Sequence, residues 1–202
     1  MTSATDNLYR FGLKLFAEPA LSIDSRECIP IFHKWIQNEN FDRLLIDVAD
    51  YTHVVEGPKV VLIGHEGNLS LDTSEGRLGL VCTQKYPDGK TLTKRLTSVA
   101  CTLISAAQLL ASEPTFANQL HFRGSELQFF SNDRLLAPPG DSSVNDLKPA
   151  MEALMKSLYP GRNYSISQSN NGAGRLKMQL AVESQVELVD LHERVSTILE
   201  AE

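Results

Sequence analysis

A chain of 202 residues is long enough for one large domain or two small ones. Hydrophobic residues make up 42% of it and charged residues 22%, a globular balance that argues against a disordered, collagen-like or coiled-coil chain. With 19 basic against 25 acidic residues the net charge is -6, which argues against nucleic-acid and anionic-membrane partners because cationic surfaces bind both.

Three features of the sequence favour a cytoplasmic protein. Residues 1–7 are polar and lack the basic and apolar regions of a secretory signal. The longest uncharged stretch, residues 96–112, contains Thr, Ser and Gln and is shorter than the ~20 apolar residues that span a membrane. The three cysteines are odd in number and widely spaced, so neither a disulfide framework nor a zinc knuckle is expected.

The first half of the chain alternates short apolar strands with helical segments. Residues 9–16 show the period-two alternation of a strand, whereas residues 27–38 carry apolar side chains at helical spacing. The run Val60-Val61-Leu62-Ile63 is apolar on both faces, which predicts a central strand. Further strands are predicted at residues 44–46, 59–65, 68–72 and 77–84.

The longest predicted helix covers residues 91–111. Its apolar side chains form one stripe, but its opposite face carries small uncharged residues such as Thr97, Cys101 and Ser105. A solvated helix face would carry charged residues there. We therefore expect both faces to be covered, by the rest of the fold or by a second subunit, and a homodimer is the expected assembly.

The second half of the chain predicts the element order ββα-ββα. Gly124-Ser125 and Asn170-Asn171-Gly172 are turn sequences that would each close a hairpin, and each hairpin would precede a helix. The predicted strands are residues 119–123, 126–130, 164–168 and 176–183, and the predicted helices are residues 147–159 and 186–199.

These elements predict an α+β protein with mainly antiparallel sheets, about ten strands and four helices. The segment 112–117 is the best boundary candidate. It divides the chain into an N-terminal lobe, residues 1–112, and a C-terminal lobe, residues 116–202, unless the two form one continuous domain.

The candidate catalytic residues are Asp47, Asp50, His53, His65 and Glu66. They follow two neighbouring apolar runs, and the ends of strands often present side chains to a ligand. Carboxylates and imidazoles at this density could bind a divalent metal or supply acid–base groups. The alternative is that they make ordinary hydrogen bonds within loops.

The sequence leaves three functions open. The favoured interpretation is a non-catalytic module that self-associates, since no nucleophile signature is present and a P-loop is excluded by Gln84 at the position of its first glycine. The alternatives are a metal-assisted hydrolase and a small-molecule-binding domain, both using the cluster at residues 47–66. Neither a cofactor nor a bound metal can be assigned from the residues.

Overall fold

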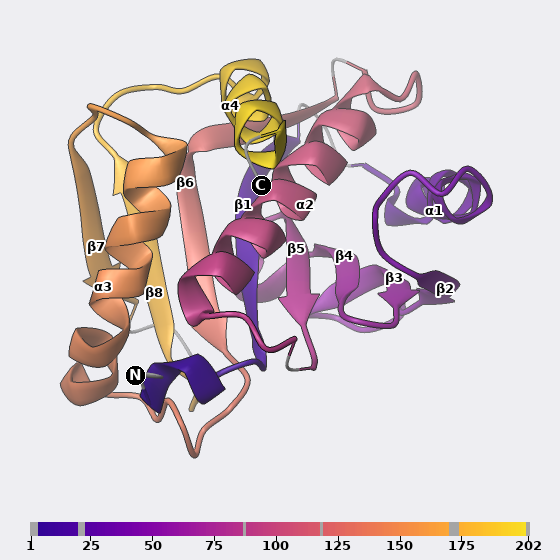
Figure 1. Ribbon diagram of the computed structural model, residues 1–202. Helices are drawn as coiled ribbons and strands as arrows, with labels where there is room; N and C mark the ends of the chain where they lie inside the picture. The colour runs from indigo at the N-terminus through magenta and orange to yellow at the C-terminus, as the bar shows by residue number, and fades with distance from the viewer. Residues whose placement is uncertain (1–3, 20–22, 87, 118, 170–173, 201–202) are drawn as a thin grey trace.

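The computed structural model describes residues 4–19, 23–86, 88–117, 119–169 and 174–200. Within these ranges, four α-helices pack against one eight-stranded antiparallel sheet (Figure 1), which confirms the predicted α+β class. The strands are β1 (Phe11–Pro19), β2 (Leu45–Asp50), β3 (Pro58–Gly64), β4 (Asn68–Asp72), β5 (Gly79–Gln84), β6 (Leu120–Ser131), β7 (Tyr164–Gln168) and β8 (Lys177–Val182). The α-helices are α1 (Cys28–Gln37), α2 (Leu92–Ser112), α3 (Asp141–Leu158) and α4 (Leu188–Glu200).

The sheet runs without a break through both halves of the chain. Its strand order is β2-β3-β4-β5-β1-β6-β8-β7, and every pair of neighbours is antiparallel. Strand β1 lies between β5 and β6, so the first strand joins the two lobes that were distinguished in the sequence. The segment at 112–117 therefore connects α2 to β6 without interrupting the sheet.

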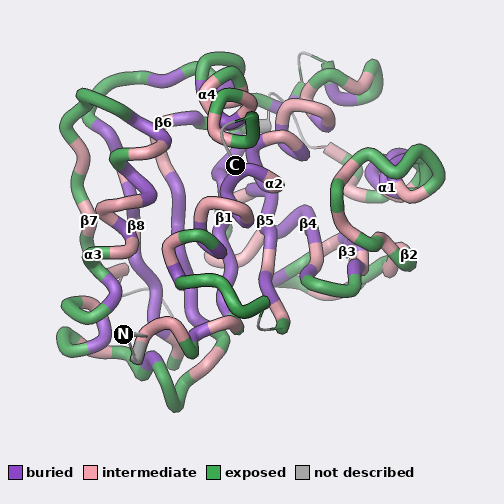
Figure 2. The backbone as a smooth tube through the Cα atoms, in the orientation of Figure 1, coloured by how far each residue is buried: buried purple, intermediate pink, exposed green. Residues whose placement is uncertain are grey.

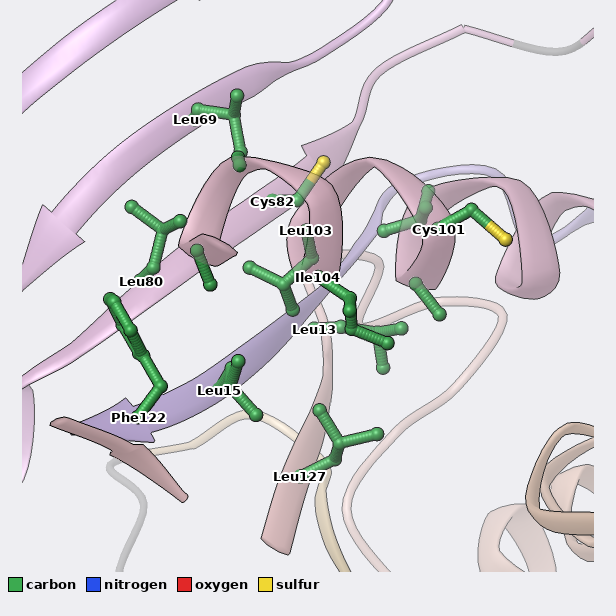
Figure 3. Close-up of a cluster of buried hydrophobic side chains, with 14 of the residues drawn as sticks. Leu13, Leu15, Leu69, Leu80, Cys82, Cys101, Leu103, Ile104, Phe122 and Leu127 are labelled. Atoms are coloured by element: carbon green, nitrogen blue, oxygen red, sulfur yellow. The ribbon is translucent and has the colours of Figure 1, made fainter. Parts of the chain in front are cut away.

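One face of the sheet, here called the first face, carries the hydrophobic core. Alternation along β1 sends Leu13 and Leu15 to this face, where both are fully buried. All four helices contribute buried side chains to the same cluster, and Figure 2 shows this buried interior. Figure 3 shows Leu13 and Leu127 beside Ile104 of α2, which packs across the middle strands.

Helix α2 is buried along its sheet side, and on its uncharged second face Cys101 is buried whereas Thr97 and Ser105 are half-buried. One side packs on the sheet, and α4 of the same chain packs across the other (Figure 1). Cys101 on α2 is 2% exposed. By length and composition alone α2 could cross a membrane, but in this fold it is the central helix of the core.

One predicted hairpin is wrong, because residues 120–123 and 126–130 of its two predicted strands, 119–123 and 126–130, belong to the single long strand β6. This strand pairs with β1, with a register shift that absorbs the extra residues around Gly124. A side chain at Gly124 would place its Cβ atom 2.5 Å from the Val186 carbonyl oxygen, so this glycine permits close approach of the chain before α4 rather than a turn.

The remaining C-terminal elements follow the predicted order. Strands β7 and β8 and helix α4 form the expected ββα unit. Helix α3 begins at Asp141, earlier than the predicted residue 147, and accommodates Pro149. The described residues contain eight strands rather than about ten. The predicted turn Asn170-Asn171-Gly172 lies outside the described residues.

Candidate functional site

Three of the five predicted site residues lie along or just beyond the edge strand β2. Asp47 is exposed and accepts a hydrogen bond from the neighbouring Val48 N–H, 2.8 Å away. Asp50 accepts from the Thr52 N–H and hydroxyl at 2.8 and 2.6 Å. These bonds, with a smaller contribution from Arg26, lower the pKa of the Asp50 carboxyl. His53 is exposed and lies near the Tyr51 ring, with 6.3 Å between ring centroids.

The other two predicted residues lie at the opposite end of the strand pair. Because β2 and β3 are antiparallel, Asp50 pairs with Val60, whereas His65 follows the far end of β3. Five residues of extended chain separate Val60 from His65, about 16 Å. His65 and Glu66 share a separate cavity of about 320 Å³ beside Tyr86. Among the described residues, no group of three or more His, Cys, Asp or Glu side chains could hold a metal ion. A catalytic role for these five residues stays a prediction.

The face of the sheet opposite the core, here called the second face, has a different composition. Phe16, Val61, Val81 and Phe130 are buried there but lie outside the continuous core cluster. Polar side chains alternate with them. The strand register places one row of side chains across all eight strands, in the order Ala49, Val61, Ser70, Val81, Lys14, Gln128, Gln179 and Ser167.

A cavity of about 350 Å³ lies on this second face. Its volume falls at the lower end of the ~300–1,000 Å³ that ligand sites occupy. Its polar lining includes Lys14, Asn68, Ser70, Asp72, Thr83, Gln128, Asn132 and Arg175, and its apolar lining is Pro58, Val61, Val81 and Phe130. The mixture of a few converging polar groups with apolar wall is typical of small-molecule sites.

Lys14 and Asp72 form a buried ion pair at one wall of the cavity. Their Nζ and Oδ1 atoms are 2.6 Å apart, and their side chains are 4% and 10% exposed. Burial lowers the pKa of the Lys14 ammonium, and the attraction of Asp72 opposes that shift. Lys14 also donates to the Arg77 and Ser74 carbonyl oxygens at 2.7 and 3.4 Å. The three hydrogens of its ammonium group are thus committed to the protein.

The segment that accepts these hydrogen bonds, residues 73–78, folds over the second face and is here called the strap. It contains the short 3-10 helix η3 (Ser74–Gly76), in which Glu75 has the left-handed φ of 61°. Glu75 forms an ion pair with Lys177 on β8. Arg77 makes two hydrogen bonds to the Glu126 carboxylate and stacks over the Phe16 ring. The strap therefore closes one side of the cavity.

Two polar side chains in the cavity have no protein partner among the described residues. Gln128 is 5% exposed and Ser70 is 8% exposed, and the side chain of neither makes a hydrogen bond to another described residue. Their polar atoms are open to the cavity, since among the described residues Arg95 Nε is the one solvent-shielded side-chain nitrogen or oxygen that lacks a partner. Because both groups line the cavity, water or a ligand that fills it can make their hydrogen bonds.

Arg175 is the third polar feature of the cavity wall. Its guanidinium lies over the Phe130 ring, 4.2 Å from the centroid, and donates a hydrogen bond to the Asn132 side chain. No carboxylate of the described residues lies within ion-pair distance of it. Burial lowers the pKa of Arg175, while Asp72 and Glu75 act in the opposite direction.

Gly12 gives the Phe130 ring its position. A Cβ atom at Gly12 would lie 2.4 Å from the ring carbon Cζ, so the ring lies directly over this glycine on the neighbouring strand. The ring in turn supports the Arg175 guanidinium. A glycine within a strand is typical of such a close approach.

Few of the described side chains that line the cavity could take part in catalysis. Its titratable side chains are Lys14, Asp72 and Arg175, and the first two neutralise each other. Sequence reasoning missed all three, because a lysine that alternates with apolar residues in a strand predicts a solvated face. The sequence contained one weak indication of this site, which is that Gly12, Lys14 and Phe16 share one face of the first strand.

No family model, no curated protein and no solved structure matches this chain in comparisons with known proteins.

Proposed function

We propose that this chain is a non-catalytic binding protein for a small molecule, which it holds in the second-face cavity. The observation that carries the proposal is the buried Gln128 amide, which faces the cavity without a hydrogen-bond partner among the described residues. Ser70 offers a second polar group without a hydrogen bond to another described residue, on the same row of side chains. A ligand with polar groups at matching positions satisfies both.

The composition of the cavity favours binding over catalysis. Its described lining contains neither histidine nor cysteine, and its one carboxylate, Asp72, is held by Lys14 and by the N–H and hydroxyl of Ser74. General acid–base or nucleophilic chemistry would need a group free to exchange a proton with the substrate. The alternative of a metal-assisted hydrolase at residues 47–66 gains no support from side chains at opposite ends of β3.

A cavity-filling variant tests this proposal. Val81→Phe places a ring in the cavity, and Val55→Phe makes the same change at a side chain that is 90% exposed and does not line the cavity. A ligand-observed NMR screen of small polar fragments should yield compounds that bind the wild type and Val55→Phe but not Val81→Phe. Ser70→Leu replaces Val81→Phe if that variant does not fold. Fragments that bind Val81→Phe as they bind the wild type would refute the site, as would a screen without hits.

Self-association is a second candidate function, favoured by apolar side chains at the β2 edge. Ile46, on the edge strand β2, is 55% exposed, and Leu44, just before this strand, is 65% exposed. A second copy of the chain could cover them as a homodimer. Light scattering at increasing protein concentration should show a dimer that Ile46→Lys dissociates. A wild-type protein that stays monomeric throughout the concentration range eliminates this candidate.

A further inference from the structure

We infer that the ligand of the second-face cavity is an amphipathic small molecule with a carboxylate, an adjacent amide and an aliphatic tail, and that Arg175 binds the carboxylate. The inference rests on the proposed function and specifies its ligand class. It follows from the way that charge, hydrogen-bonding capacity and apolar surface are distributed along the cavity.

The charge of the ligand follows from Arg175. The cavity lining contains two cations, Lys14 and Arg175. Lys14 forms an ion pair with Asp72, whereas Arg175 forms no ion pair with any described residue. Stacking over the Phe130 ring and a hydrogen bond to the Asn132 side chain hold the Arg175 guanidinium at the cavity wall. A guanidinium held in this way presents its remaining N–H groups to an anion, and a carboxylate matches their fork geometry.

The amide of the ligand follows from Gln128. This residue is two positions before Phe130 on the same face of β6, so it lies next to the arginine end of the cavity. Its carboxamide offers donors and an acceptor side by side. A carboxylate or an ether would satisfy only its donors, whereas a ligand amide satisfies donor and acceptor together. A ligand amide therefore matches both the donor and the acceptor of the Gln128 side chain.

The aliphatic tail of the ligand is inferred from the apolar side chains at the end of the cavity opposite Arg175. Val81 lies two strands from Gln128, and Val61 and Pro58 lie beyond it on β3. Strands are ~4.8 Å apart, so the distance from Gln128 to Val81 along the row is about 10 Å. An unbranched ligand that places its carboxylate at Arg175 reaches Val81 with an aliphatic chain. Burying that chain against the valines adds a favourable hydrophobic contribution.

A matched pair of probes tests the inference. Hexanoylglycine has the carboxylate, the amide and a tail, and hexanoylglycinamide differs from it only in a neutral carboxamide at the end. Titration calorimetry should show that the wild type binds hexanoylglycine at least tenfold more tightly than hexanoylglycinamide. Arg175→Gln should remove that preference without weakening hexanoylglycinamide. Gln128→Leu should weaken both probes equally.

The control is Arg123→Gln, which removes a partly exposed arginine of β6 that does not line the cavity and should leave both affinities unchanged. A wild type that binds the two probes equally would overturn the inference, as would an Arg175→Gln variant that keeps the preference. In either case the fragment screen with Val81→Phe still decides the proposed function. If neither probe binds while other fragments compete for the cavity, the ligand class is wrong and the binding site stands.

Discussion

Lys14 and Asp72 place two opposite charges inside the fold, where each depends on the other. Both side chains are almost fully buried, and the lysine also holds the strap through the Arg77 carbonyl oxygen. Taking charges out of water is costly, and a buried pair compensates that cost only while both partners are present. Removal of one partner is therefore more damaging than replacement of both.

Lys14→Met should lower the free energy of unfolding by about 3–5 kcal/mol, because it leaves the Asp72 carboxylate buried without its ammonium. The double variant Lys14→Met with Asp72→Leu should recover much of that loss. Urea denaturation of the single and double variants measures both values. A single variant as stable as the wild type would mean that the pair is far better solvated than its burial indicates.

A second prediction concerns pH and the buried Cys28. Burial, with smaller contributions from Glu27 and Asp24, raises the pKa of the Cys28 thiol from 9.0 to about 12. Burial also raises the pKa of Cys82 and of Tyr159. Above pH 9 the unfolded chain releases these protons and the folded chain keeps them. The unfolded state then binds fewer protons, so stability falls as pH rises.

Cys28→Ala should make that decline shallower between pH 9 and 11, by up to about 1.4 kcal/mol per pH unit. Denaturation curves at several pH values give the slope directly. Ile31→Val on the same helix is the control, since it changes a buried side chain without an ionisable group. An unchanged slope in Cys28→Ala would show that the thiol ionises as readily in the folded chain as in the unfolded one.

At the scale of elements, periodicity in the sequence was informative wherever one face of an element is buried. The alternation at residues 9–16 and the stripe at 91–111 correspond to β1 and α2. The misreading of Gly124-Ser125 as a turn has a physical cause: a glycine permits a turn and a close approach equally. Only the position of Val186, 62 residues later, distinguishes the two.

Gly124→Ala should therefore destabilise the fold by about 1–3 kcal/mol, because the new Cβ atom would overlap the Val186 carbonyl oxygen. The Gly124 carbonyl also accepts the Tyr159 hydroxyl at 2.7 Å, so any displacement weakens a buried hydrogen bond. Thermal unfolding measures the loss. Ser125→Ala, one residue further on, should be nearly neutral, since its side chain makes no hydrogen bond to another described residue. Equal stability of Gly124→Ala and Ser125→Ala would exclude the close approach.

The candidate site was beyond the reach of sequence patterns for a related reason. Asp72 is 58 residues from Lys14, and Lys177 is 102 residues from Glu75. Each of these residues is an ordinary polar position on a half-buried strand or in a loop. What makes them a site is the register of β1 with its neighbours and the path of the strap, and both depend on long-range pairing.

At the scale of the whole molecule, the central position of β1 predicts one cooperative unit. It pairs with β5 and β6, and a single hydrophobic cluster includes side chains from both halves. Unfolding in guanidinium should therefore show coincident transitions by the fluorescence of Trp35, in the first half, and by far-UV circular dichroism. Two separated transitions would instead favour the division into lobes at residues 1–112 and 116–202.

Methyl NMR spectra of the protein during titration with hexanoylglycine test the central claim, that the second-face cavity is the binding site. The side chains of Val61 and Val81 line the cavity, whereas those of Leu71 and Leu80 lie on the first face of β4 and β5. The methyl resonances of the two pairs therefore report on opposite faces of the sheet. We predict shifts that saturate with added compound at the two valines and leave the two leucines unmoved. Shifts at the leucines without shifts at the valines would contradict the assignment of ligand binding to the second face.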